Sequence, residues 1–190
     1  MGLGKQQWLL YAIDFGLTKQ YINPKTQEHI RFRNGRSIVG TARFVSINTH
    51  MGMEQSRRDD IESIGYILIY LATGSLPWKG FVEKGKLEDY NKIKEKKMKT
   101  TIPLLCKGLP SQFESYFKYC RELRFTQKPN YQYLRGLFKQ VMTIKGYINN
   151  YKYDWITRNK NNRASSREEV HTRLNIYECR NSGMISFKFS

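Results

Sequence analysis

The residues best suited to chemistry lie near the start of the sequence, where an apolar run ends in Asp14-Phe15-Gly16. The run Leu9 to Ile13 has the composition of a β-strand, and the glycine that follows favours a turn. A strand that delivers a carboxylate to such a turn holds a phosphate-bridging magnesium ion in enzymes that transfer phosphoryl groups. The sequence therefore indicates magnesium and phosphate chemistry at Asp14.

Basic residues outnumber acidic residues, and this excess limits the classes of possible partner. The sequence has 33 Lys and Arg against 16 Asp and Glu, a formal net charge of +17. Such a field attracts nucleic acid, acidic membranes, and acidic or phosphorylated protein, and charge alone does not choose among them. A generally solvated basic surface is the simpler alternative. With 190 residues, of which 39% are hydrophobic, the sequence is long enough for one domain with a sizeable core.

Cysteine usage and hydropathy indicate a cytoplasmic or nuclear protein without a membrane partner. Cys106, Cys120 and Cys179 are odd in number and widely spaced, which favours reduced thiols and indicates no zinc site. The longest apolar stretch, residues 61–72, contains Glu62 and is too short to span a bilayer. The amino terminus has no signal-peptide pattern.

One long helix should form the centre of the fold. Ser56 is a good N-cap, and Asp59 three residues later approximates a capping box. Residues 61–72 are apolar on all sides, so we expect this helix to be buried. Gly74 and Pro77 should end it.

Shorter elements surround this helix in the sequence. Before it we expect a β-hairpin, with a turn over residues 2–7 and a strand over 8–13, and then a long functional loop over 18–50. After it we expect a charged, solvent-facing helix over 87–98. The aromatic stripes of residues 111–124 and 131–144 predict two further helices that face a core.

Seven motifs follow one another along the chain: Tyr11-Ala12-Ile13-Asp14-Phe15-Gly16-Leu17, Gly40-Thr41-Ala42-Arg43-Phe44-Val45-Ser46-Ile47-Asn48-Thr49-His50, Glu54-Gln55-Ser56-Arg57-Arg58-Asp59-Asp60, Gly74-Ser75-Leu76-Pro77-Trp78, Glu95-Lys96-Lys97-Met98, Leu104-Leu105-Cys106-Lys107-Gly108, and Leu123-Arg124-Phe125 with Lys128-Pro129-Asn130-Tyr131. Together they resemble the casein kinase I family of serine/threonine protein kinases. Most kinases have Ala-Pro-Glu after the activation loop, whereas this family has Ser-Ile-Asn, as at residues 46–48.

The resemblance implies roles for the residues of the first two motifs. Asp14 would bind the magnesium ion that bridges the ATP phosphates, so it is both a catalytic and a metal-binding candidate. Phe15 would pack beneath the nucleotide and Gly16 would permit the backbone turn, so both belong to the expected cofactor site. Thr41 would lie beside the acceptor hydroxyl of the substrate.

The resemblance also implies a structural acid and an anion site. Asp60 would accept hydrogen bonds from the backbone of the catalytic loop; the alternative is an ordinary helix-capping acid. Arg36 and Arg43 would bind acidic or phosphorylated substrate, because a guanidinium bonds phosphate in a bidentate way. Their alternative is a pair of solvated loop arginines. Where the family commonly has a lysine that completes this anion site, the sequence has Asp89.

The fold implied is mainly α: the C-terminal lobe of a protein kinase over residues 1–155, with a short N-terminal β-hairpin and an activation loop. A basic, mobile tail over 156–190 lies outside the resemblance. The alignment of motifs places Met1 just after the catalytic loop. The sequence shows no His-Arg-Asp motif, no second metal-binding asparagine and no Gly-rich loop. We therefore expect weak or no binding of Mg-ATP, no phosphate transfer and a tendency to aggregate, with apolar surface of the central helix exposed and Asp60 without donors.

Three functions remain open from the sequence. The first is a casein kinase I-type enzyme that transfers the ATP γ-phosphate to Ser/Thr of acidic or phosphorylated proteins, present as an inactive fragment. The second is a non-catalytic module that binds acidic partners through a basic face. That face would consist of Arg31, Arg33, Arg36, Arg43, Arg57 and Arg58. Nucleic-acid binding, the third, has only the net charge to support it.

Overall fold

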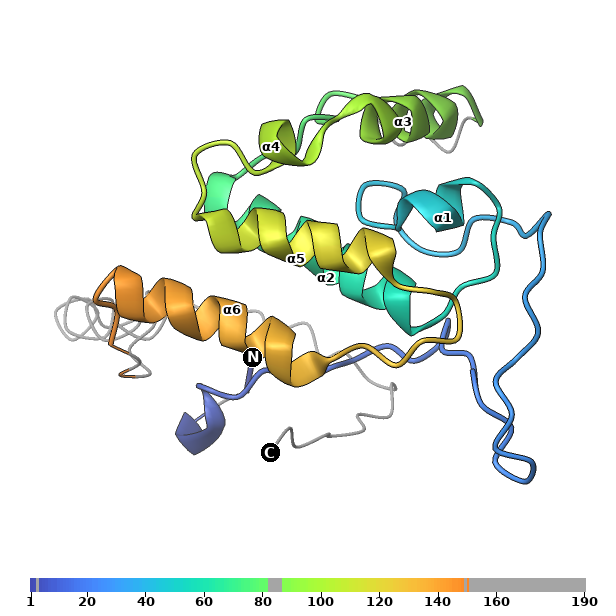
Figure 1. Ribbon diagram of the computed structural model, residues 1–190, viewed down its shortest axis with the longest axis horizontal. Coiled ribbons are helices and arrows are strands. Elements are labelled where there is room, and N and C mark those ends of the chain that lie inside the picture. The colour runs from blue at the N-terminus through green and yellow to red at the C-terminus, as the bar shows by residue number, and fades with distance from the viewer. Residues whose placement is uncertain (3, 82–86, 149, 151–190) are drawn as a thin grey trace, which may run out of the picture. The chain divides into compact units, whose positions relative to one another are not determined.

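The computed structural model describes residues 1–2, 4–81, 87–148 and 150, and their fold is mainly helical (Figure 1). The helices are the 3-10 helix η1 (Gly4–Gln6) and α1 (Ile47–His50), α2 (Arg57–Thr73), α3 (Leu87–Lys99), α4 (Ile102–Leu105), α5 (Ser111–Glu122) and α6 (Tyr131–Ile144). The predicted helical class is therefore confirmed. The chain divides into two compact units, Leu17–Tyr147 and the remainder, and each is described by itself.

Helix α2 begins and ends where the sequence predicts. Ser56 precedes it in an extended conformation, and the carboxylate of Asp59 accepts a hydrogen bond of 2.8 Å from the Ser56 backbone N–H. This bond satisfies a backbone donor at the helix start, and the negative charge suits the positive end of the helix dipole. At the other end Gly74 has φ 70°, the left-handed conformation that favours glycine after a helix.

Buried side chains of α2, α3, α5 and α6 contribute to the core of the larger unit. Helix α5 contacts α2, α4 and α6, as its central place in Figure 1 suggests. Tyr66 of α2 stacks edge-on against Trp78 with ring centroids 5.1 Å apart, and Phe117 of α5 lies 5.2 Å from the Tyr66 ring. All three side chains are at most 2% exposed. The prediction that the aromatic stripe of residues 111–124 faces the core is confirmed.

Helix α2 is not buried on all sides. The prediction of a buried helix is therefore wrong in part, whereas the prediction of exposed apolar surface on it agrees with the structure. Ile64, Ile67 and Leu71 are 45%, 39% and 74% exposed. These positions follow the helical spacing and so form one apolar stripe. The apolar surface expected on this helix is therefore present.

Helix α3 is not simply solvent-facing, so that prediction is wrong in part. Most of its charged residues are exposed, but Ile93 and Lys97 are each 1% exposed. The two residues are four positions apart and so lie on the same side of the helix. Lys97 contacts the carbonyls of Ala42 and Val45 and the rings of Tyr66 and Trp78, which explains why it is buried.

The predicted N-terminal hairpin is not formed by the described residues. Residues 8–13 are irregular, and the backbone bonds near them run from Gly2 to Leu9 and from Leu9 to Gln6. Leu10 and Ile13 are 74% and 69% exposed. A strand is stable when a neighbouring strand satisfies its backbone and covers its side chains, and no such neighbour lies in the described part of this unit.

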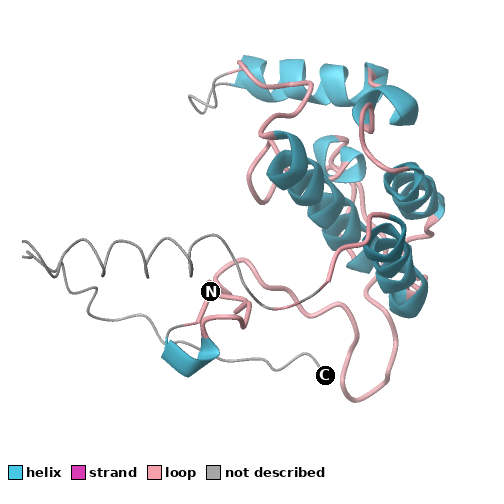
Figure 2. Cartoon of the chain, turned by 90° about the vertical axis from the view of Figure 1, so that its left-hand side faces the viewer, coloured by secondary structure: helices cyan, strands magenta, loops and turns pink. Residues whose placement is uncertain are grey.

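The long loop predicted over 18–50 is largely confirmed, with an isolated antiparallel bridge between Ile22 and His29 and the short helix α1 near its end. Figure 2 shows the extent of this loop and no strand in the described part of the chain. The end of the expected kinase-like region near residue 155 and the tail over 156–190 lie outside the described residues. None of the described helices combines the length and apolar character needed to cross a lipid bilayer.

Candidate functional site

Asp14 has an unusual backbone conformation. Its φ is 61°, in the left-handed region that few residues other than glycine adopt. Its Oδ1 atom accepts a hydrogen bond of 3.3 Å from the Gly16 N–H, which closes a tight local turn. Aspartate is among the residues that tolerate this region, and such conformations concentrate at functional sites. Asp14, Phe15 and Gly16 are all exposed.

The described residues offer magnesium one ligand rather than a complete site. No group of three or more His, Cys, Asp or Glu side chains that could hold a metal ion occurs among them. Magnesium usually takes one or two protein carboxylates and completes its shell with water and phosphate oxygens. Asp14 therefore fits one such ligand, and the remaining ligands would have to come from a nucleotide and water.

Thr41 and Asp60 line the same cavity, which lies in the larger unit and has a volume of about 320 Å³. Its lining is Leu17, Val39, Gly40, Thr41, Phe44, Val45, Thr49, Gln55, Asp59, Asp60, Ser63 and Ile67. Thr41 begins a tight turn, since its carbonyl oxygen accepts bonds from the N–H groups of Phe44 and Val45. The structure thus brings together two residues that the sequence assigns to different roles.

Asp60 and its neighbour Asp59 differ in what they bind. Asp59 is buried and accepts hydrogen bonds from the Ser46 hydroxyl at 2.6 Å and from the Ser56 backbone. Among the described residues, Asp60 accepts no hydrogen bond. Desolvation raises the pKa of the Asp60 carboxyl, and repulsion from Asp59 raises it further. The capping role considered for Asp60 is therefore performed by Asp59.

Arg36 is held by a nearly buried carboxylate. Its Nε atom lies 3.5 Å from Glu54, whose side chain is 6% exposed and also accepts a 2.7 Å bond from Lys19. That bond from Lys19 is the main cause that lowers the pKa of Glu54. The backbone N–H of Arg36 donates to the Gly52 carbonyl at 2.8 Å, so both the backbone and the guanidinium of Arg36 are fixed.

Arg43 has different neighbours from Arg36. The indole N–H of Trp78 donates to the Arg43 carbonyl at 2.9 Å. The Arg43 guanidinium lies over the ring of Tyr70, 6.0 Å from its centroid. Both arginines belong to the larger unit, but the contacts described for them involve different residues.

Two arginines of the expected basic face take part in internal packing instead. Arg57 donates to the Thr126 carbonyl at 2.6 Å and lies over the Tyr21 ring. Arg58 donates to the Leu123 carbonyl at 3.3 Å and its side chain is 13% exposed. Both therefore hold the loop after α5 against the start of α2.

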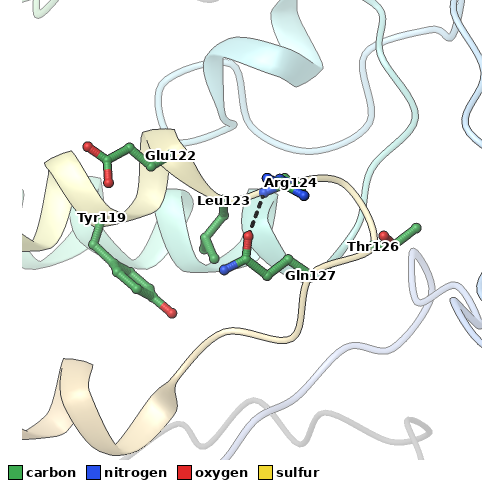
Figure 3. A pocket seen from close by; sticks show the side chains of 6 residues that line it. All are labelled: Tyr119, Glu122, Leu123, Arg124, Thr126 and Gln127. Atoms are coloured by element: carbon green, nitrogen blue, oxygen red, sulfur yellow. Dashed lines mark hydrogen bonds between the residues drawn. The ribbon is translucent and has the colours of Figure 1, made fainter.

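A larger polar cavity of about 590 Å³ lies at the end of α5 (Figure 3). It is lined by Tyr119, Glu122, Leu123, Arg124, Thr126 and Gln127. Gln127 Oε1 accepts the Arg124 backbone N–H at 3.1 Å, which closes the loop around the cavity. None of the residues proposed from the sequence lines this cavity, whereas Thr41 and Asp60 line the smaller one.

Sequence reasoning missed three buried side chains around the Thr41 turn. Lys97 donates to the carbonyls of Ala42 and Val45, and His50 Nε2 lies 3.0 Å from the Ala42 oxygen. Trp78 is the third. Lys97 was within a recognised motif, and its spacing of four from Ile93 was the available signal that it shares the buried face of α3.

No model of a known protein family matches this sequence. The function is therefore argued from the motifs and from the geometry of the residues.

Proposed function

We propose that this chain is the substrate-binding lobe of a casein kinase I-type serine/threonine kinase, and that it binds acidic or phosphorylated protein segments through Arg36 and Arg43. The observation that carries the proposal is the cavity shared by Thr41 and Asp60. The motifs imply that one of these residues lies beside the acceptor hydroxyl and that the other supports the catalytic loop. A shared cavity is what those two roles require.

The surroundings of the arginines support anion binding. Arg36 uses its Nε atom toward Glu54, and a guanidinium has further N–H donors on the same plane. The Arg36 side chain is 47% exposed, so an anion has access to it. The Arg43 carbonyl accepts a hydrogen bond from Trp78, so its backbone is already ordered and a ligand has only the side chain left to order.

Phosphate transfer is proposed for the family enzyme, and anion binding for this chain by itself. When bound, magnesium would neutralise the charge that builds on the transferred phosphoryl group. Asp14 would hold it from a turn that its own carboxylate stabilises. The sequence contains no His-Arg-Asp motif to act on the acceptor hydroxyl. We therefore predict that the chain by itself binds Mg-ATP weakly or not at all and transfers no phosphate.

The binding proposal is tested with an acidic serine peptide, with and without phosphate on one serine, by fluorescence anisotropy. The double variant Arg36→Gln/Arg43→Gln should weaken binding of the phosphopeptide by about tenfold or more, because charge-assisted hydrogen bonds contribute about 1.5–3 kcal/mol each. The matched control is Arg135→Gln/Lys139→Gln, which removes the same charge from exposed positions of α6. Equal losses in the two double variants would mean that net charge alone attracts the peptide.

The alternative function, a non-catalytic interaction module, would use the same arginines. A substitution at Asp14 distinguishes it from the kinase. Mg-ATP binding, even if weak, that is lost in Asp14→Asn would favour the kinase, whereas peptide binding without any response to nucleotide is expected of both functions. Steep salt-dependent binding to random DNA, unaffected by the arginine substitutions, would favour the nucleic-acid alternative.

A further inference from the structure

The side chain of Lys97 lies in the interior of the larger unit, although it belongs to the most charged helix. It is 1% exposed, and its Nζ atom donates to the carbonyls of Ala42 at 2.9 Å and Val45 at 2.5 Å. The ammonium also lies over the rings of Tyr66 and Trp78, 4.7 and 5.1 Å from their centroids. Carbonyl dipoles and ring faces both stabilise a cation, so this environment replaces part of the lost hydration.

The carbonyls that accept hydrogen bonds from Lys97 belong to one turn, residues 41–46. Its Ala42 carbonyl accepts from His50 as well as from Lys97, and its Arg43 carbonyl accepts from Trp78. The backbone carbonyls of residues 42, 43 and 45 thus accept hydrogen bonds from side chains of other segments. A turn has few backbone bonds of its own, so these donors fix where it lies.

The turn carries two residues of the candidate site. Thr41 is exposed at the cavity it shares with Asp60, and Arg43 presents its guanidinium over Tyr70. Lys97 is too deeply buried to touch a substrate at this cavity. Any effect of Lys97 on binding must therefore act through the backbone of the turn.

We propose that Lys97 is a positioning residue: through the Ala42 and Val45 carbonyls it fixes the 41–46 turn and so sets the affinity of Arg43 for phosphorylated or acidic peptide. The consequence for peptide affinity rests on the function proposed above, whereas the effect on the turn does not. Lysine suits this role because a compact ammonium has three donors and fits between two carbonyls and two rings. A neutral side chain of similar length would leave the Val45 carbonyl without this donor and the Ala42 carbonyl with His50 alone.

The test compares Lys97→Met with Lys96→Met, which removes the same charge from the adjacent, exposed position. Amide hydrogen exchange is measured at Phe44 and Val45, whose N–H groups are bonded within the turn, and in α5 as a reference. In Lys97→Met the two turn amides should exchange about tenfold faster or more while those of α5 keep their protection. Lys96→Met should change neither. Unchanged exchange at residues 44 and 45 in Lys97→Met, or an equal increase across α5, would overturn the proposal.

Phosphopeptide affinity is measured on the same three proteins. The affinity should fall about tenfold in Lys97→Met and less than about twofold in Lys96→Met, since exposed charges interact weakly. If the unsubstituted chain binds no phosphopeptide, the proposed function fails while the exchange result still decides the role of Lys97.

A measurement on the unsubstituted chain covers the case in which Lys97→Met does not fold. One lysine ammonium should give a ¹⁵N signal that persists at neutral pH, with proton contacts to the rings of Tyr66 and Trp78, because burial slows its exchange with water. The absence of any such protected ammonium would contradict the proposal.

Discussion

Two adjacent aspartates of α2 show how position decides the role of a residue. Asp59 accepts hydrogen bonds from Ser46 and Ser56 and so joins the helix start to the preceding loop. Asp60, one position later, lines the same cavity as Asp59 but accepts no hydrogen bond among the described residues. An acid whose bonds are satisfied internally stabilises the fold, whereas an acid without donors is available to a partner.

At the same scale, Gly65 is required by close packing rather than by backbone conformation. A Cβ atom at Gly65 would lie 2.7 Å from Phe117 Cζ and 2.8 Å from Tyr116 Cε1, and both rings are buried. We predict that Gly65→Ala lowers the free energy of unfolding by about 1–3 kcal/mol, the usual cost of overpacking a core.

The matched control is Gly136→Ala in α6, where an added Cβ meets no atom within 4 Å. It should stabilise the chain by about 0.5–1 kcal/mol, because alanine has the higher helix propensity. Urea denaturation of both variants measures the difference, and destabilisation of the same size at both sites would contradict the packing argument.

At the scale of elements, helices α1 and α3 and the 41–46 turn share one buried polar cluster. His50 ends α1 and is 5% exposed, and Lys97 of α3 lies close enough to repel a proton on it. Both donate to the Ala42 carbonyl, so the His50 ring must carry its proton on Nε2. A neutral histidine and a charged lysine together hold the turn.

This arrangement predicts a loss of stability in mild acid. Desolvation, and then the charge of Lys97, lower the pKa of His50 from 6.5 to about 4. Between these values the unfolded chain binds a proton that the folded chain does not. The stabilisation that comes from neutral His50 is therefore fully present above pH 6.5. It decreases by up to about 3 kcal/mol as the pH falls toward 4.

The measurement is the free energy of unfolding against pH for the unsubstituted chain and for His50→Gln, which keeps a donor but does not titrate. The difference between the two proteins should change with the pH over this window and be constant above it. A difference that is the same at both ends of the window would show that His50 is not buried in the neutral form.

At the scale of the whole molecule, a strong positive charge is combined with exposed apolar surface. The net charge of +17 opposes association between copies, whereas the stripe of Ile64, Ile67 and Leu71 favours it. Salt screens the charge but leaves the apolar attraction, so the balance depends on ionic strength.

We therefore predict that the chain self-associates increasingly as salt is raised, and that Ile64→Gln/Leu71→Gln suppresses this. The substitutions should change stability by less than about 0.5 kcal/mol because both side chains are exposed. Light scattering at low and high salt measures the association.

Met98→Gln/Leu104→Gln is the control, since those two residues are 52% and 55% exposed outside the α2 stripe. Suppression of the same size by the control would show that general surface hydrophobicity, and not this stripe, drives association.

The sequence by itself determined the features that depend on neighbouring residues: the start of α2 at Ser56 and Asp59, its end at Gly74, and the core-facing stripe of α5. These rest on backbone hydrogen bonds and helical spacing within one segment. The motifs of the sequence also indicated Thr41 and Asp60 as site residues, but they did not indicate that the two residues share a cavity.

Only the tertiary structure decided the features that depend on distant segments. The segment 8–13 has strand-like composition but no neighbouring strand among the described residues. Arg57 and Arg58 each donate a hydrogen bond to a backbone carbonyl at the end of α5 or in the loop after it. Lys97 belongs to a charged helix, yet its ammonium is buried against carbonyls more than fifty positions earlier. The physical reason is that burial and hydrogen bonding are properties of what surrounds a side chain, and those surroundings come from parts of the chain that local sequence patterns do not relate.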